Sequence, residues 1–171
     1  MTTLYVDNIA PNLQSKISAP NLQLPSGSVV QVATGSVYSG SLITSTSYSD
    51  TGLAASITPT SASSDILVIV QYQGGPTVNG GSDGRVYWRI FETSTSAQLT
   101  EVDNRAYDYG GSGTIQWHSQ ILQTLHSPST TSTLTYKLQG RFYTGSELSF
   151  NTGYDSNNKS TSFITLMEIA G

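Results

Sequence analysis

Short stretches of alternating apolar and polar residues recur along the chain from residue 29 onward. Alternation with a period of two places the apolar side chains on one face of a β-strand. The pattern predicts strands over residues 29–34, 53–58, 65–73, 85–91, 114–125, 134–138, 148–150 and 163–169. Gly, Pro, Asn, Asp and Ser between these stretches indicate turns. No stretch has the period of an amphipathic helix, so we expect an all-β fold, an antiparallel β-sandwich or jelly roll of about eight strands.

The apolar faces of the predicted strands indicate the core. Residues 66–70 form an uninterrupted apolar run, which is typical of a strand covered on both faces. In the stretch 85–91, Trp88 shares its face with Val86 and Ile90, and the opposite face holds Tyr87, Arg89 and Phe91. In the stretch 114–125, the apolar face holds Ile115, Trp117, Ile121 and Leu125. We expect the core to include Val68, Trp88, Ile90, Trp117, Ile121, Leu138 and Leu166.

The first 28 residues have a different character. They contain three of the six prolines, and Ala-Pro-Asn-Leu-Gln occurs twice, at 10–14 and 19–23. Proline removes a backbone donor and disfavours helix in the residue before it, which predicts an extended, irregular segment. A disordered tail is one interpretation, but the spaced apolar residues and the repeat favour an arm that docks on another surface. We therefore expect an anchoring arm over 1–28 and a head domain over 29–171. The expected docking residues are Leu4, Val6, Ile9, Leu13, Ile17, Leu22 and Leu24.

Composition narrows the classes of function. Charged residues make up 11% of the 171 residues, less than half the ~25% of ordinary globular chains. The chain has no Cys, which excludes disulfides, Cys-ligated metals and thiol catalysis. Its seven Lys and Arg are scattered and the net charge is −4, so we expect no nucleic-acid binding. No apolar run approaches the ~20 residues of a membrane span, so we expect no membrane insertion.

Two features resemble enzymatic or metal sites. The string Gly80–Gly84 matches the G-x-S-x-G nucleophile elbow, but that elbow needs a helix after the Ser, and here β-type alternation follows. His118 and His126 are eight residues apart on one predicted strand, or ~26 Å, which is too far to share a metal ion. We interpret them as surface or interface residues. We expect no catalytic residue, no metal site and no cofactor.

The segment 101–113 combines carboxylates with tyrosines. Its candidate ligand residues are Glu101, Asp103, Tyr107, Asp108 and Tyr109. Clustered oxygens suit a hard cation, and tyrosine rings suit a sugar, so this loop could hold either ligand. The alternative is a solvated loop whose tyrosines cover a sheet edge, and the absence of an EF-hand spacing favours this simpler interpretation.

Several segments resemble a domain common in the structural proteins of tailed bacteriophages. They are residues 24–32 (LPSGSVVQV), 46–53 (TSYSDTGL) and 56–68 (SITPTSASSDILV), with the ending at 165–171 (TLMEIAG). The opening at 4–9 (LYVDNI) is similar to virion-anchoring N-termini. Residues 74–130 carry no distinctive likeness. Asp65 departs from the pattern, since relatives often have Lys there, which changes the charge at a strand entry.

The resemblance implies a virion surface protein with a trimeric jelly-roll head, similar to TNF- or C1q-like folds, and it supplies no catalytic residues. Some such proteins decorate capsids and others form tail-fibre tips. We expect a non-enzymatic homotrimeric capsid decoration (cement) protein on the virion surface, docked on the major capsid protein through its arm and stabilising the shell. The alternative is a short receptor-binding tail-fibre subunit that binds a host surface glycan or receptor through loops 74–84 and 101–113.

Overall fold

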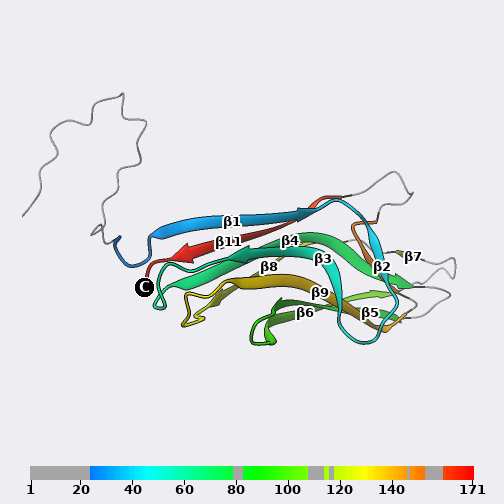
Figure 1. Ribbon diagram of the computed structural model, residues 1–171. Coiled ribbons are helices and arrows are strands. Elements are labelled where there is room, and N and C mark those ends of the chain that lie inside the picture. Colours follow the sequence, from blue (N-terminus) through cyan, green and yellow to red (C-terminus); the bar gives the residue numbers. More distant parts are fainter. Residues whose placement is uncertain (1–23, 79–82, 108–113, 116–117, 146, 153–159) are drawn as a thin grey trace, which may run out of the picture.

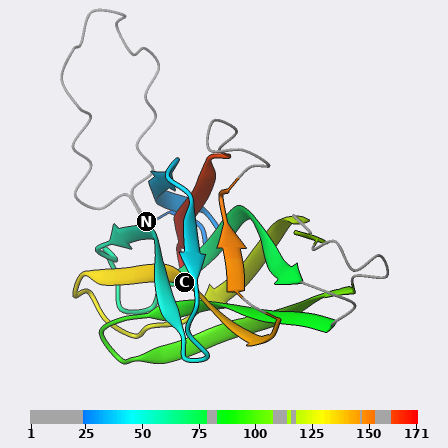
Figure 2. The same ribbon diagram turned by 90° about the vertical axis from the view of Figure 1, so that its right-hand side faces the viewer.

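Two antiparallel β-sheets pack face to face in the computed structural model (Figure 1; Figure 2). The structure describes residues 24–78, 83–107, 114–115, 118–145, 147–152 and 160–171. Every regular element in these ranges is a strand, eight of them eight or more residues long and three of them four or fewer. The expected all-β sandwich of about eight strands is confirmed.

The first sheet, sheet A, is built around the long strand β4. Its members are β1 (Val29–Val37), β2 (Ser41–Ile43), β4 (Asp65–Val78), β7 (Thr114–Ile115), β8 (His118–His126), β10 (Glu147–Phe150) and β11 (Ser162–Ile169). On one side of β4, β11 pairs with its first half and β10 with its second half. On the other side lie β8 and β7. Strand β1 extends the sheet beyond β11, and β2 extends it beyond β10.

The second sheet, sheet B, has the order β3-β9-β5-β6. Its strands are β3 (Ser49–Ile57), β5 (Asp83–Glu92), β6 (Ala97–Tyr107) and β9 (Leu134–Thr144). The chain changes sheet six times: between β2 and β3, β3 and β4, β4 and β5, β6 and β7, β8 and β9, and β9 and β10. This wrapping of successive strands around two sheets is the jelly-roll arrangement.

Trp88 of β5 lies at the centre of the core, fully buried between the sheets. Its ring centroid is 4.8 Å from that of Tyr72 in sheet A and 6.0 Å from that of Phe150. Two glycines leave the space that the indole fills. A Cβ atom at Gly74 would lie 2.6 Å from Cζ2 of Trp88, and one at Gly140 would lie 3.0 Å from its Cε3. The large ring therefore fits only where both neighbouring strands lack a side chain.

The predicted core is confirmed at Val68, Trp88, Ile90, Leu138 and Leu166, all of which are fully buried. It is wrong at Ile121, which is 64% exposed, whereas the adjacent Leu122 is buried. Both faces of β8 carry a large aliphatic residue, so its own pattern does not decide which face is inside. Pairing with β4 decides it, because Ile121 lies opposite the exposed Gln71 and Leu122 lies opposite the buried Val70. Trp117 lies outside the described residues.

The segment 101–113 was expected to be a loop, but Glu101–Tyr107 belongs to strand β6. The alternation is hard to see in the sequence because a β-bulge interrupts the pairing of β5 with β6 between Ile90 and Phe91. Leu99 and Val102 consequently both pack against the core although they are three residues apart. The expected loop over 74–84 is also mostly strand, since β4 continues to Val78 and β5 begins at Asp83.

We expect Trp88→Ala to lower the free energy of unfolding by ~3–5 kcal/mol, because it removes a buried ring and leaves a cavity between the sheets. Tyr38→Ala is the control, since Tyr38 is 59% exposed and its loss should change stability far less. Chemical denaturation followed by circular dichroism measures both variants. Equal effects of the two substitutions would contradict the placement of Trp88 at the centre of the core.

Candidate functional site

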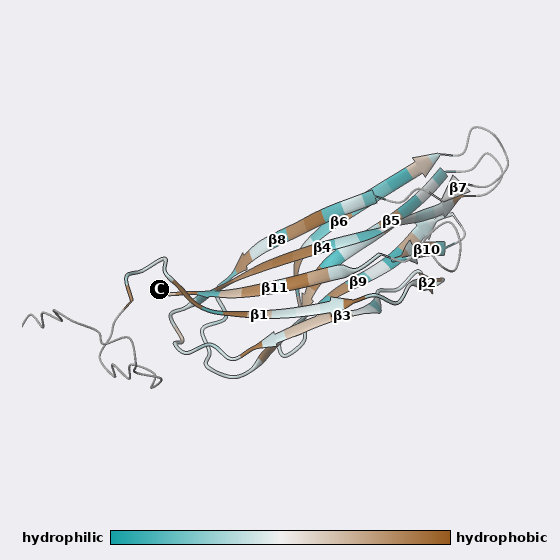
Figure 3. Cartoon of the chain, turned by 90° about the horizontal axis from the view of Figure 1, so that it is seen from above, coloured by the Kyte–Doolittle hydropathy of each residue, from teal (hydrophilic) through white to brown (hydrophobic). Residues whose placement is uncertain are grey.

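The outer face of sheet A is apolar across its four long strands. One row of paired residues, Val32, Met167, Leu67 and Leu125, crosses β1, β11, β4 and β8. Two rows further along, the exposed Phe163 and Ile121 lie on either side of a glutamine. Figure 3 looks down on this sheet and shows brown, hydrophobic stretches in the neighbouring strands β11, β4 and β8.

We call this surface the apolar face. It consists of the outward side chains of Val32, Leu67, Ile69, Ile121, Leu125, Phe163 and Met167. The outward residues between them are Thr, Ser and Gln. Along the described strands β1, β11, β4 and β8, Asp65 at the end of β4 is the charged residue of this outer face. Contiguous apolar surface of this kind is unusual on a monomer in water and marks interaction sites.

The outer face of sheet B is chemically opposite. Every lysine and arginine of the described residues is on it: Arg85, Arg89, Arg105, Lys137 and Arg141. Three of these side chains pair with carboxylates. Asp103 accepts from Arg85 at 2.9 Å and has Nε of Arg105 at 3.8 Å, and Asp50 accepts from Lys137 at 2.6 Å. Such exposed pairs contribute little stability, typically below ~1 kcal/mol, so their main effect is to fix where charge lies.

The remaining two arginines, Arg89 and Arg141, make no ion pair within the described residues. Both lie against aromatic rings. The guanidinium carbon of Arg89 is 3.8 Å from the ring centroid of Tyr48 and 4.6 Å from that of Phe91. The guanidinium carbon of Arg141 is 4.2 Å from the centroid of Tyr87 and 5.1 Å from that of Tyr48. We call these five residues the Arg–Tyr patch.

Hydrogen bonds hold the patch in place. Nε of Arg89 donates to Oε1 of Gln139 at 2.9 Å, and one terminal nitrogen donates to Oε1 of Gln98 at 3.1 Å. The hydroxyl of Tyr48 donates to the carboxylate of Glu101. Burial and this bond to Glu101 raise the pKa of Tyr48, so its hydroxyl stays protonated and able to donate.

The candidate ligand residues of 101–113 are thus only partly brought together. Glu101 and Asp103 share the outer face of sheet B, where Glu101 binds Tyr48 and Asp103 binds arginine. Tyr107 is 46% exposed at the end of β6. Asp108 and Tyr109 lie outside the described residues. The alternation in the sequence predicts Tyr87, Arg89 and Phe91 on one face of a strand. It does not predict the patch, because Tyr48 and Arg141 come from distant segments of the chain.

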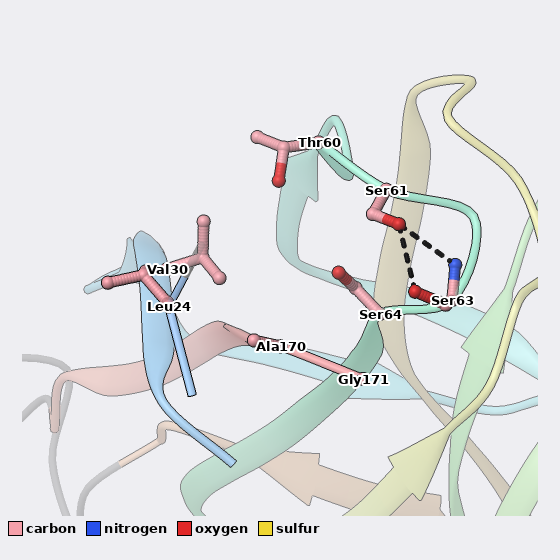
Figure 4. Close-up of a pocket in the computed structure, with 8 residues that line it drawn as sticks. All are labelled: Leu24, Val30, Thr60, Ser61, Ser63, Ser64, Ala170 and Gly171. Atoms are coloured by element: carbon pink, nitrogen blue, oxygen red, sulfur yellow. Dashed lines mark hydrogen bonds between the residues drawn. The ribbon is translucent and has the colours of Figure 1, made fainter. Parts of the chain in front are cut away.

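Of the expected docking residues, Leu24 lies within the described part of the chain, and it is 43% exposed. It lines a hollow of about 250 Å³ at the end of the sandwich where the C-terminus also lies (Figure 4). The other lining residues are Val30, Thr60, Ser61, Ser63, Ser64, Ala170 and Gly171. The expected docking residues Leu4, Val6, Ile9, Leu13, Ile17 and Leu22 lie outside the described residues.

A buried carboxylate, Glu168, fixes the loop beside this hollow. It accepts from the backbone and hydroxyl of Thr60, at 2.8 and 2.7 Å, and from Nε2 of Gln31 at 2.6 Å. Burial alone would raise the pKa of Glu168, but these hydrogen bonds outweigh it and lower the pKa. Glu168 is therefore a structural group whose negative charge is already used within the fold.

The two histidines occupy the ends of β8 on the same side as the buried Leu122, and both are half-buried. Nδ1 of His126 is 2.9 Å from the hydroxyl of Tyr136, a core residue of sheet B. We predicted from the sequence that both histidines are surface or interface residues. Within the chain, half-buried His126 links the two sheets through this contact.

The described part of the chain contains no group of three or more His, Asp or Glu side chains placed to hold a metal ion. In the same residues there is no helix with the length and hydropathy of a membrane span.

Comparison with known proteins gives a structural match. No protein-family model matches the chain, and no curated protein matches its sequence. A solved structure of the Eiger TNF from S. frugiperda is similar over 81% of this chain and 92% of that chain, with 13% sequence identity and a TM-score of 0.45.

A second buried carboxylate, Glu92, makes stability depend on pH. It accepts from the backbone and hydroxyl groups of Ser94 and Thr95 at 2.6–2.9 Å. Burial opposes ionisation, but these bonds prevail and lower the pKa of Glu92 to about 2. The folded state therefore holds its proton less tightly than the unfolded state does, and this stabilisation is present above the unfolded pKa and lost as pH falls.

We expect the free energy of unfolding to fall as pH drops from 4.5 toward 2, the interval between the ordinary and folded pKa values of Glu92. Glu92→Gln should lose roughly 2–3 kcal/mol at neutral pH and show a shallower decline in acid, since one of the responsible groups is gone. Urea denaturation at successive pH values measures both. Parallel pH curves for the two proteins would contradict this role of Glu92.

Proposed function

We propose that this chain is a non-enzymatic structural protein of a tailed-phage virion. In its leading form the proposal is a homotrimeric capsid decoration protein that docks on the major capsid protein through residues 1–28 and stabilises the shell. The phage assignment rests on the resemblance of residues 24–32, 46–53 and 56–68. The observation that carries the self-association is the apolar face of sheet A.

A second copy of this chain suits the apolar face for a physical reason. Around a rotation axis, residues near the axis meet their own copies, so a charged face would bring like charges together. The apolar face avoids this repulsion, because its outward polar residues are uncharged except for Asp65 at one end. Burial of apolar area contributes about 25 cal/mol per Å², so several exposed aliphatic side chains supply a substantial driving force for association.

The proposed arm leaves the head at the end of the sandwich that holds the C-terminus. The amide of Gly27 donates to the carbonyl of Ala170 at 2.7 Å, and the amide of Ala170 donates to the carbonyl of Ser28 at 2.9 Å, which ties the last residues of the arm to the segment that follows β11. Twenty-three extended residues could reach as far as ~80 Å, enough to cross to a neighbouring subunit or the shell. Ordering such a segment costs ~1–2 kcal/mol per residue, so apolar contacts need backbone hydrogen bonds to an acceptor strand beside them.

The full-length protein should have three times the 18.2 kDa chain mass in solution at micromolar concentration. Replacing Ile121 and Leu125 together by Asp should shift it to monomer, because each trimer would then gain buried carboxylates in its interface. Light scattering coupled to size-exclusion chromatography measures the masses.

Tyr143→Asp is the matched control, because Tyr143 is similarly exposed at 58% but lies on sheet B. It should leave the mass unchanged. A monomeric unmodified protein, or dissociation by Tyr143→Asp as well, would overturn the assignment of the interface.

Deleting residues 1–23 tests the role of the arm. The truncated head should keep its circular dichroism spectrum and its number of subunits but no longer sediment with phage particles that lack the native copy, because it would lack all the docking residues except Leu24. Leu13→Asp and Leu22→Asp in the full chain should each weaken binding, and more so together. Undiminished sedimentation of the truncated protein would move the anchor to the head.

The Arg–Tyr patch favours the second candidate function, a short receptor-binding tail-fibre subunit, because its arginines and tyrosines are half-buried at the surface, and these residue types are typical of binding surfaces. Copy number per virion separates the two candidates, since a decoration protein is present in far more copies than a fibre.

A further inference from the structure

The two arginines of the Arg–Tyr patch make no ion pair within the described residues, so their charge is available to a ligand. We propose that it is a binding site for an acidic carbohydrate. In this assignment the guanidinium groups of Arg89 and Arg141 bind the anionic group of the sugar, and the rings of Tyr48 and Tyr87 contact an apolar face of the sugar ring.

The positive charge of the two arginines favours an anionic ligand. Arg85, Arg105 and Lys137 on the same face have carboxylate partners, so their charge is largely compensated. Arg89 and Arg141 have none within the described residues and instead lie against aromatic rings. A guanidinium group presents paired donors that match a carboxylate or sulfate. Asp50 interacts electrostatically with Arg89 but is bonded to Lys137, and Glu101 is bonded to Tyr48. Arg89, Arg141 and Lys137 thus outnumber these two carboxylates, and the excess positive charge favours an anion.

Rigidity is the second argument. Arg89 belongs to β5 and Arg141 to β9, the two inner strands of sheet B. The side chain of Arg89 is held between Tyr48 and Phe91 and bonded to Gln139 and Gln98. Little side-chain freedom is then left to lose when a ligand binds, which favours affinity on an otherwise open surface.

The surroundings of the two arginines favour a sugar over other anions. Acceptors for hydroxyl groups surround the arginines, namely the carboxylates of Asp50 and Glu101 and the amide oxygens of Gln98 and Gln139. Aromatic rings beside polar acceptors are suited to a sugar, which is apolar on its ring faces and polar at its edge. A nucleic acid carries a long row of phosphates and needs a continuous basic stripe, which the outer face of sheet B does not offer, so it fits less well.

This inference goes beyond the shell-binding role and holds for a monomer as for a trimer. The Arg–Tyr patch and the apolar face are on opposite sheets, so covering one leaves the other open. A failed carbohydrate test would leave the trimer and arm predictions unaffected.

Three polysaccharides serve as probes for the full-length protein: polygalacturonate for carboxylates, dextran sulfate for sulfates and neutral dextran. Binding is measured by calorimetry at low and moderate salt. We expect binding to at least one acidic polymer, weaker at higher salt, and none to dextran. The stronger acidic probe identifies the anionic group. Binding to neither acidic polymer, equal binding to dextran, or tighter binding to duplex DNA than to either polymer would overturn the proposal.

Two double variants localise the site. Arg89→Gln with Arg141→Gln should weaken binding at least roughly tenfold, because both anion contacts are lost. Arg105→Gln with Lys137→Gln removes the same charge from the same face and should change affinity by less than about threefold, since only long-range attraction is lost. Equal losses would show general attraction to the sheet and overturn the site.

Tyr48→Leu tests the aromatic contact separately, because it leaves every charged residue of the patch in place. It removes the ring that lies between the two guanidinium groups, and we expect it also to weaken binding, with an unchanged dependence on salt. Melting curves confirm that each variant is folded. Full affinity in Tyr48→Leu would overturn the aromatic part of the assignment.

Discussion

The packing of Trp88 between the sheets constrains the rest of the structure. Its indole ring fills the space that Gly74 leaves in sheet A and Gly140 leaves in sheet B, and it contacts both Tyr72 and Phe150. A shift of one residue in β5 would turn Trp88 outward and bring Tyr87 or Arg89 into the core, so this position fixes the register of the strand. Because β5 pairs with both β6 and β9, the same constraint sets which residues of sheet B face solvent.

The strand register sets which residues lie on the two outer faces, and these faces differ chemically. Sheet A presents aliphatic residues with uncharged polar residues between them, whereas sheet B presents the lysines and arginines of the described residues beside tyrosines. In a chain with 11% charged residues, this separation leaves one surface suited to apolar association and another suited to an anionic ligand. The buried carboxylates Glu92 and Glu168 belong to neither surface, because their oxygens are occupied by turn and loop donors.

The sequence predicts those parts of the fold whose pattern is local. The apolar run at 66–70 and the alternation around Trp88 identify β4 and β5, and Val68, Ile90 and Leu138 are buried as expected. Features that depend on pairing are not readable in this way. Strand β6 was missed because a β-bulge breaks its alternation, and the inner face of β8 was assigned wrongly because only β4 distinguishes Ile121 from Leu122. The Arg–Tyr patch needs β9 beside β5, which no single segment encodes.

In the trimer that we propose, other copies of the chain cover the apolar face, while the outer face of sheet B stays open. Thiol labelling tests it directly, because the chain has no cysteine of its own. Gln123→Cys and Gln98→Cys form a matched pair, since both glutamines are exposed in one chain and lie on the outer faces of the edge strands β8 and β6. The account predicts that the thiol at position 123 reacts at least roughly tenfold more slowly than the thiol at 98 in the native protein, and equally fast after denaturation. Equal rates in the native protein would show that the apolar face is open to solvent and would contradict the account.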